Sequence, residues 1–230
     1  MVDGSPSGSS DKDVRRDLYP GYDVLGKRDT PSWNAQTRAV IDERLGLDPG
    51  RHTFLDDAEW ATLCAICERI VPQPADRPGR VPVAAMLDDK LRQGHSSGYR
   101  HPDMPREGEA WKRALKAIEA ESQTAWGRPF HQASAVEQDD LLRRMQEGDL
   151  DGSAWGGMPP KIFFKQRLLP DLARAYYAHP TAWNEIGWGG PAGPRGYVRL
   201  NLNRRDPWEA AEAKPGHEAE ALQANRRVGR

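Results

Sequence analysis

The sequence predicts an all-α fold: a single irregular helical bundle with long Gly/Pro-rich loops and flexible termini. Three observations support this. Apolar residues recur at three- and four-residue spacing in several segments, which is the spacing of one helical face. Most of these segments end at a glycine or a proline. No long run of alternating β-branched residues is present, so strands are at most marginal.

The composition fits one helical domain and excludes several functional classes. The chain has 230 residues, of which 37% are hydrophobic, and its 8 Trp, 6 Tyr and 4 Phe supply a large buried area per residue. The formal net charge of −1 argues against binding to nucleic acid or to a membrane surface, because such proteins usually carry a basic excess. No apolar stretch is long enough to span a bilayer.

We divide the chain into three parts from their composition. Residues 1–32 form a disordered or partly ordered N-terminal arm, residues 33–200 a helical domain, and residues 201–230 a charged mobile C-terminal tail. The arm begins with a Gly/Ser/Asp-rich stretch, and the tail is rich in charged residues and alanine but low in aliphatic ones.

The first two helices of the domain are expected over residues 33–45 and 56–71. Ser32 can cap the first helix, which stops at a glycine. The second helix is the clearest amphipathic segment of the chain, and Asp56 or Asp57 can cap it.

Three further amphipathic helices follow, over residues 82–93, 108–126 and 135–147. The last of these has Ser134 as its expected cap, with Glu137 at the position that completes a capping box.

The stretch from residue 159 to residue 196 combines an apolar helix with a loop rich in glycine and proline. Pro170 lies within the helical part and predicts a bend in one continuous helix. The loop that follows carries Trp183 and Trp188. Because Trp and Arg are enriched at binding hot spots, the loop is either a structural cap over the core or a surface that binds a partner. Phosphate binding is disfavoured, since Pro191 and Pro194 lack the N–H groups that a phosphate needs.

No pattern in the chain indicates catalytic, cofactor-binding or metal-ligating residues. Cys64 and Cys67 form a CxxC pair, but no second ligand pair for zinc exists and no histidine follows for haem attachment. Their position on the apolar face of a predicted helix favours two buried small hydrophobic side chains over metal or redox chemistry. The six histidines show no HxxxH or HExxH spacing and no pairing with a nucleophile motif. His95 and His101 could share a metal, but a solvent-exposed loop is the favoured interpretation.

Several segments, in order, resemble one known family, the gluconate 2-dehydrogenase subunit 3 family. Residues 62–72, TLCAICERIVP, resemble its opening "TLxAIxDRIVP". Residues 81–91 are similar to the family's next helix, and residues 127–148 to its "GxxFxxLsxxqqdxLLxxxqxG" segment. Residues 163–180 resemble "FFxxlrxxtxxGyysdP", and the Ile-Gly-Trp and glycines that follow resemble its closing motif. The likeness extends over about residues 56–196, and residues 181–184 depart from the family's usual Tyr-Gly-Gly-Asn.

The resemblance implies a small, all-helical, non-catalytic subunit without a cofactor of its own. Its partner would be a large FAD-containing dehydrogenase of the glucose-methanol-choline (GMC) type that oxidises a sugar, a sugar acid or a polyol, in some complexes together with a cytochrome c subunit. We expect the loop 181–197 to bind this partner, and the N-terminal arm is a further candidate for the same interface. The expected interface residues are Tyr177, Trp183, Asn184, Trp188, Arg195 and Tyr197.

The expected compartment is the cytoplasm. Exported members of the family carry a twin-arginine signal, but Arg15 and Arg16 are followed by a polar, turn-prone stretch instead of an apolar run. The periplasm is expected only if an exported partner carries the chain there. Two alternative functions stay open: a stand-alone helical interaction or chaperone-like protein, and a metal or thiol-redox protein that uses Cys64 and Cys67.

Overall fold

The structure is a computed structural model that describes residues 17–74, 79–94, 96, 98, 100–191 and 209–227. Within these ranges the regular elements are all helical, with no strand, which confirms the all-α prediction. Contacts divide the chain into two compact units. The first unit comprises residues 1–34 and 183–230, and the second unit comprises residues 35–182. The sequence-based boundaries at residues 32 and 200 stay a prediction.

The second unit begins with α1 (Ala35–Leu45) and α2 (Asp57–Ile70). A capping box starts α2: the Asp56 side chain accepts a hydrogen bond from the Glu59 N–H, and the Glu59 carboxylate accepts one from the Asp56 N–H. The buried face of α2 includes Leu63, Ile66 and Cys67, at the three- and four-residue spacing seen in the sequence.

Three amphipathic helices follow, and each ends at a glycine in the left-handed region. They are α3 (Val83–Gln93), α4 (Glu107–Trp126) and α5 (Ala135–Glu147). The predicted capping box of Ser134 and Glu137 is present at the start of α5. Since a glycine adopts positive φ without steric cost, Gly94, Gly127 and Gly148 stop these helices where the sequence indicated.

The helix around Pro170 is continuous and contains a π-helical turn. The segment runs as α6 (Pro160–Phe163), the π turn Phe164–Leu168 and α7 (Leu169–Ala178), and is followed by α8 (Pro180–Trp183). In the π turn the Leu169 N–H bonds to the Phe164 carbonyl, five residues earlier. The wider turn lies directly before Pro170, which has no N–H to continue the α-helical pattern.

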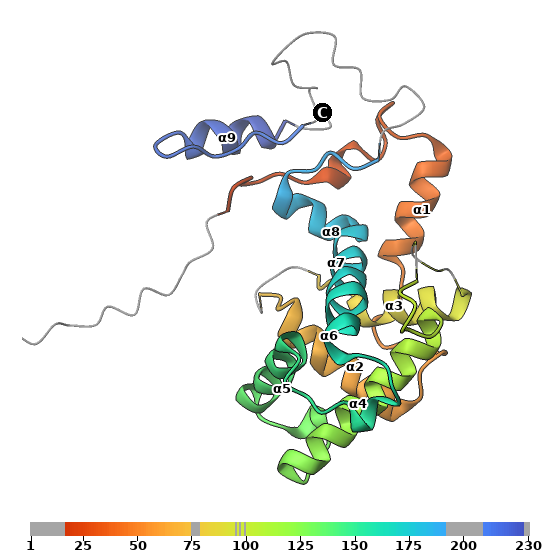
Figure 1. The fold of residues 1–230 in the computed structure, drawn as a ribbon. Coiled ribbons are helices and arrows are strands. Elements are labelled where there is room, and N and C mark those ends of the chain that lie inside the picture. The colour runs from red at the N-terminus through yellow and green to blue at the C-terminus, as the bar shows by residue number, and fades with distance from the viewer. Residues whose placement is uncertain are drawn as a thin grey trace, which may run out of the picture. The chain divides into compact units, whose positions relative to one another are not determined.

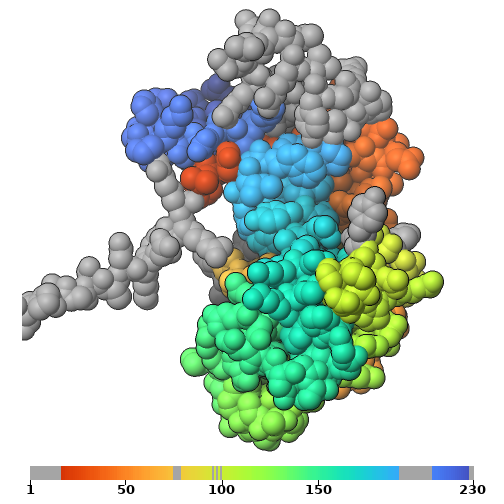
Figure 2. All heavy atoms as spheres, viewed as in Figure 1, coloured from red at the N-terminus to blue at the C-terminus, as the bar shows by residue number. Residues whose placement is uncertain are grey.

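The core of the second unit forms where α2, α4 and the α6–α7 segment meet (Figure 1). Trp111, Trp155 and Phe163 are fully buried there, and the Trp111 and Phe163 rings meet edge to face with centroids 5.1 Å apart. In the space-filling view, the spheres of α5 and of the α6–α7 segment lie directly against one another (Figure 2).

A buried carboxylate on α7 joins three helices of this core. The Asp171 side chain, with no exposed surface, accepts a hydrogen bond of 3.0 Å from the Trp111 indole N–H and pairs with Lys90 Nζ at 3.1 Å. Arg174 approaches the same carboxylate at 3.3 Å. Lys90 also pairs with Glu107. Because a buried charge is tolerated only when it is paired and hydrogen-bonded, this cluster fixes how α3, α4 and α7 pack.

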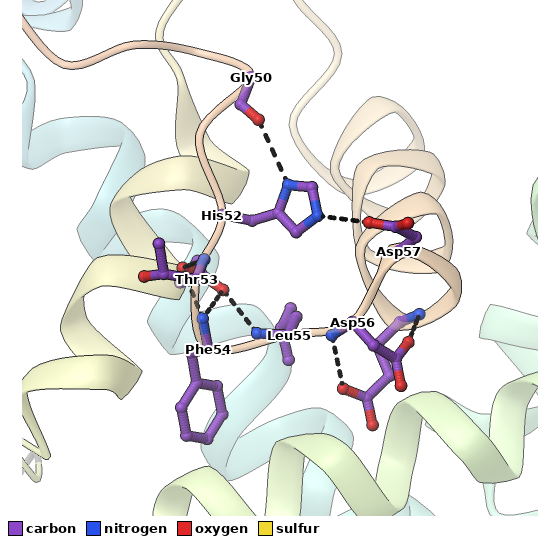
Figure 3. A network of polar contacts seen from close by, with 9 residues as sticks. Gly50, His52, Thr53, Phe54, Leu55, Asp56 and Asp57 are labelled. Atoms are coloured by element: carbon purple, nitrogen blue, oxygen red, sulfur yellow. Dashed lines mark hydrogen bonds and ion pairs between the residues drawn. The ribbon is translucent and has the colours of Figure 1, made fainter.

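A second buried carboxylate organises the turn before α2 (Figure 3). Asp88 on α3 is 2% exposed and accepts hydrogen bonds from the backbone N–H groups of Thr53, Phe54 and Leu55, at 2.8 to 3.2 Å. Next to this turn, His52 bonds to Asp57 and stacks on the Trp60 ring. The hydrogen bond that the His52 ring makes to the Asp57 carboxylate raises the pKa of His52.

The first unit contains helical turns at Val24–Lys27 and Asn184–Ile186, and the helix α9 (Glu218–Asn225). Residues 209–227 belong to the stretch for which the sequence predicts a mobile tail; they include α9 and bond to the N-terminal segment, and the mobility of the tail stays a prediction. Glu218 and Glu220 lie in the first turn of α9, where negative charge is favourable. The remaining short turns, in the second unit, are Phe130–Gln132 and Ser153–Trp155.

Candidate partner-binding surface

The two tryptophans of the Gly/Pro-rich loop have different environments. Trp183 is fully buried, whereas Trp188 is 40% exposed. Their rings meet edge to face with centroids 4.6 Å apart, and the Trp188 N–H donates to the Trp183 carbonyl at 3.0 Å. The buried indole therefore supports the exposed one, which limits the conformations that Trp188 can adopt.

The N-terminal segment, for which the sequence predicts a disordered or partly ordered arm, packs against this loop. The Val24 N–H donates to the Asn184 side-chain oxygen at 2.8 Å, and the Tyr22 hydroxyl donates to the Trp188 carbonyl at 3.5 Å. Val24 and Trp33 are buried in the same unit. Residues far apart in the sequence thus contact residues 184 and 188.

Two glycines of the loop are required by its conformation and by its neighbours. Gly187 and Gly190 have positive φ, 62° and 73°. A Cβ atom at Gly187 would overlap the Tyr19 ring. A Cβ atom at Gly190 would lie 2.8 Å from Cζ2 of Trp33 and 3.2 Å from Cζ3 of Trp183. At these two positions the backbone approaches aromatic rings too closely for any side chain.

The C-terminal residues complete the unit through Asn225, which is 2% exposed. Its amide nitrogen donates to the Pro20 and Ala211 carbonyls, each at 3.0 Å, and its oxygen accepts from the Ala211 N–H at 2.7 Å. The Ala213 N–H donates to the Leu18 carbonyl at 2.8 Å. The segment 17–34 is therefore bonded to both the loop and the C-terminal residues.

The structure places the six expected interface residues in different situations. Trp188 is partly exposed as expected, while Trp183 packs in the interior and the Asn184 side chain bonds within the unit. Tyr177 lies in the second unit and is 47% exposed. Arg195 and Tyr197 lie outside the described residues. A role of these residues in partner binding stays a prediction.

Two further apolar side chains of the first unit are exposed, and neither is among the interface residues expected from the sequence. Ile186 is 45% exposed and lies two residues before Trp188, and Leu18 is 42% exposed. The Ile-Gly-Trp sequence of the loop could have indicated Ile186, whereas no local pattern indicates Leu18.

A family model identifies the chain. The model for gluconate 2-dehydrogenase subunit 3 matches residues 57–190, which is more than half of the 230 residues. The chain belongs to the gluconate 2-dehydrogenase subunit 3 family. Comparison with curated proteins and with solved structures gives no match. The family is that of a subunit of a dehydrogenase complex, so the resemblance seen in the sequence is confirmed.

In this family member the matched region ends at Gly190 and includes Trp183 and Trp188. The segments 17–34 and 209–227 lie outside it, yet both belong to the unit that contains the loop. The first unit therefore joins a family loop to two segments that the family model does not contain.

Of the two cysteines of α2, Cys67 is buried and Cys64 is half-buried. Burial raises the pKa of the Cys64 thiol to about 11 and raises that of Cys67 further. A reactive cysteine needs the opposite shift, toward the thiolate, so this environment does not favour thiol chemistry. Across the described ranges, no group of three or more His, Cys, Asp or Glu side chains could hold a metal ion. A search of the same residues finds no helix with the length and hydropathy to cross a bilayer.

Proposed function

We propose that this chain is the small, non-catalytic subunit that binds and stabilises a large FAD-dependent dehydrogenase of the GMC type. The large subunit would hold the FAD and oxidise a sugar, a sugar acid or a polyol, with a cytochrome c subunit as a further member in some complexes. The match to the subunit family carries this proposal. The cytoplasm is its proposed compartment, unless an exported partner carries the complex to the periplasm.

Trp188 is the residue on which we centre the proposed interface. Large aromatic side chains dominate interface energetics, and a side chain that is already held in place loses little conformational entropy on binding. Trp188 meets both conditions, because its ring is 40% exposed and packs on the buried Trp183. Ile186, on the same loop, adds apolar area.

Replacing Trp188 by alanine is expected to weaken the complex with the dehydrogenase subunit at least tenfold, because truncating an interface hot spot costs about 2 kcal/mol or more. The fold of the small subunit should persist, since Trp183 and its buried neighbours stay in place. The measurement is the dissociation constant of the two purified subunits, with circular dichroism of the variant alone as a check of folding.

Val136 provides a matched control on α5. Its side chain is 79% exposed, so Val136→Ala also removes exposed apolar surface but leaves the loop untouched. An unchanged dissociation constant for Trp188→Ala, with a folded variant, would remove Trp188 from the interface. Equal losses for both variants would show that the effect is not specific to the loop.

A further inference from the structure

The second unit contains a cavity of about 820 Å³ beside the start of α4. This volume lies within the range of about 300–1,000 Å³ that is typical of ligand sites in proteins. The cavity is lined by residues of the turn before α2, of α3 and the loop after it, of α4 and of the π turn. Those that the argument uses are Phe54, Arg106, Glu107, Gly108, Lys112 and Arg167.

One wall of the cavity is apolar and fixed in position. The three backbone hydrogen bonds to Asp88 hold the turn that carries Phe54 (Figure 3). The Phe54 ring packs closely on Gly108, where a Cβ atom would lie 2.8 Å from the ring atom Cζ. Lys112 Nζ lies 4.7 Å from the centre of the same ring. The cavity thus has a rigid aromatic surface with a cation next to it.

The acidic side chains in the cavity lining are already engaged. Glu107 pairs with Lys90, and Arg167 approaches it at 3.8 Å from the π turn. Glu109 pairs with Arg113 at 2.7 Å. These carboxylates therefore do not leave a net negative charge on the wall of the cavity.

The cavity lining carries more positive than negative formal charge. Arg106 is exposed, and its side chain makes no hydrogen bond or ion pair within the described part of the chain. Lys112 has Glu59 as an ion-pair partner only at 3.8 Å. The formal net charge of the whole chain is −1, so this local excess of positive charge does not reflect a basic protein.

We propose that this cavity receives an acidic segment of the dehydrogenase subunit, with an apolar side chain next to the carboxylate. The inference rests on the proposed function and adds a second contact surface to it. The apolar neighbour would pack on Phe54, and the carboxylate would lie between Arg106 and Lys112. Arginine binds carboxylates well because its planar group presents several N–H donors in a fixed arrangement.

Arg106→Glu is the variant that tests this contact. Because Arg106 has no side-chain partner within the described ranges, its replacement breaks no ion pair there, and the variant is expected to fold. Its dissociation constant for the dehydrogenase subunit should rise about tenfold at low salt, and less at high salt, where charges are screened. Arg51→Glu is the matched control, since Arg51 is also exposed, lacks a side-chain partner in the described residues and lies outside the cavity.

A zero-length carbodiimide cross-link between the subunits gives an independent readout. The Lys112 amine should link to an aspartate or glutamate of the dehydrogenase, and mass spectrometry should identify the acidic segment. Lys116 is the internal control, because it lies one turn further on α4, approaches the same Glu59 at 3.8 Å and does not line the cavity. Links from Lys116 but not from Lys112 would overturn the proposal.

The outcomes separate this inference from the proposed function. If the wild-type chain does not bind the dehydrogenase subunit, the proposed function fails. If the wild type binds and Arg106→Glu binds equally well at low salt, the function stands and the proposed contact is refuted. Weakening by Arg106→Glu but not by Arg51→Glu, together with the Lys112 link, supports the contact.

Discussion

Replacing Asp171 by alanine is expected to lower the free energy of unfolding by about 4 kcal/mol, because breaking a buried ion pair from one side costs about 3–5 kcal/mol. The change leaves the buried Trp111 indole N–H without its acceptor and removes the carboxylate that pairs with Lys90 and Arg174. Urea denaturation of the purified chain, followed by circular dichroism, measures the loss.

Asp139 provides the contrast for this prediction. It forms two hydrogen bonds with Arg69, at 2.7 and 2.6 Å, but its side chain is 52% exposed. Asp139→Ala should cost no more than about 1 kcal/mol, because exposed ion pairs contribute little. The free energy of unfolding of Asp171→Asn should lie between those of the wild type and of Asp171→Ala, because the amide oxygen can still accept a hydrogen bond from the Trp111 indole N–H. Equal losses for Asp171→Ala and Asp139→Ala would show that the buried cluster is not what stabilises the core.

Replacing Asp88 by alanine is expected to destabilise the chain by about 3 kcal/mol. The change removes the acceptor of three backbone N–H groups, and each buried donor left without a partner costs about 1–3 kcal/mol, less where water can reach it. The turn that carries Phe54 should also become mobile, so its amides should exchange faster with solvent hydrogen. Denaturant titration and amide hydrogen exchange at residues 53–55 measure these two effects.

The neighbouring Asp89 supplies the control on the same helix. Its carboxylate is 39% exposed and bonds to Arg92 and Gln93 on the surface of α3. Asp89→Ala should therefore change the stability by well under 1 kcal/mol. If Asp88→Ala were as stable as Asp89→Ala, the three hydrogen bonds would not be what holds the turn.

Much of the fold could be predicted because local signals decide it. The Ser134–Glu137 capping box predicted the start of α5, and the glycines after α3, α4 and α5 predicted their ends. These signals act within one helical turn, so they can be read without knowledge of the tertiary structure. Asp56 and Asp57 were equal candidates for the cap of α2, and the structure selects Asp56 because its side chain reaches the Glu59 N–H.

The parts that could not be predicted depend on contacts between residues far apart in the chain. The bond from Val24 to Asn184 joins residues separated by 160 positions, and the bond from Asn225 to Pro20 joins residues separated by 205. No local pattern indicates such a pairing. The same holds for Trp183. Its position next to a glycine-rich loop indicated an exposed side chain, but Trp183 is buried in the unit to which the N-terminal segment also belongs.

The candidate partner surface was therefore predicted only in part. The loop and Trp188 followed from the sequence, but the support that the loop receives from segments 17–34 and 209–227 did not. The excess of positive charge in the cavity beside α4 could not be predicted from the sequence either. Phe54 meets Arg106 and Lys112 only because the turn before α2 packs on α4.

The most direct test of the central claim is to purify the tagged chain from its native cells and record the absorbance spectrum and molar mass of the product. The proposed function predicts one species that contains a stoichiometric larger subunit, shows flavin absorbance and oxidises a sugar, a sugar acid or a polyol with an artificial electron acceptor. A colourless chain recovered alone, while the dehydrogenase activity of the cells remains in the unbound fraction, would contradict it.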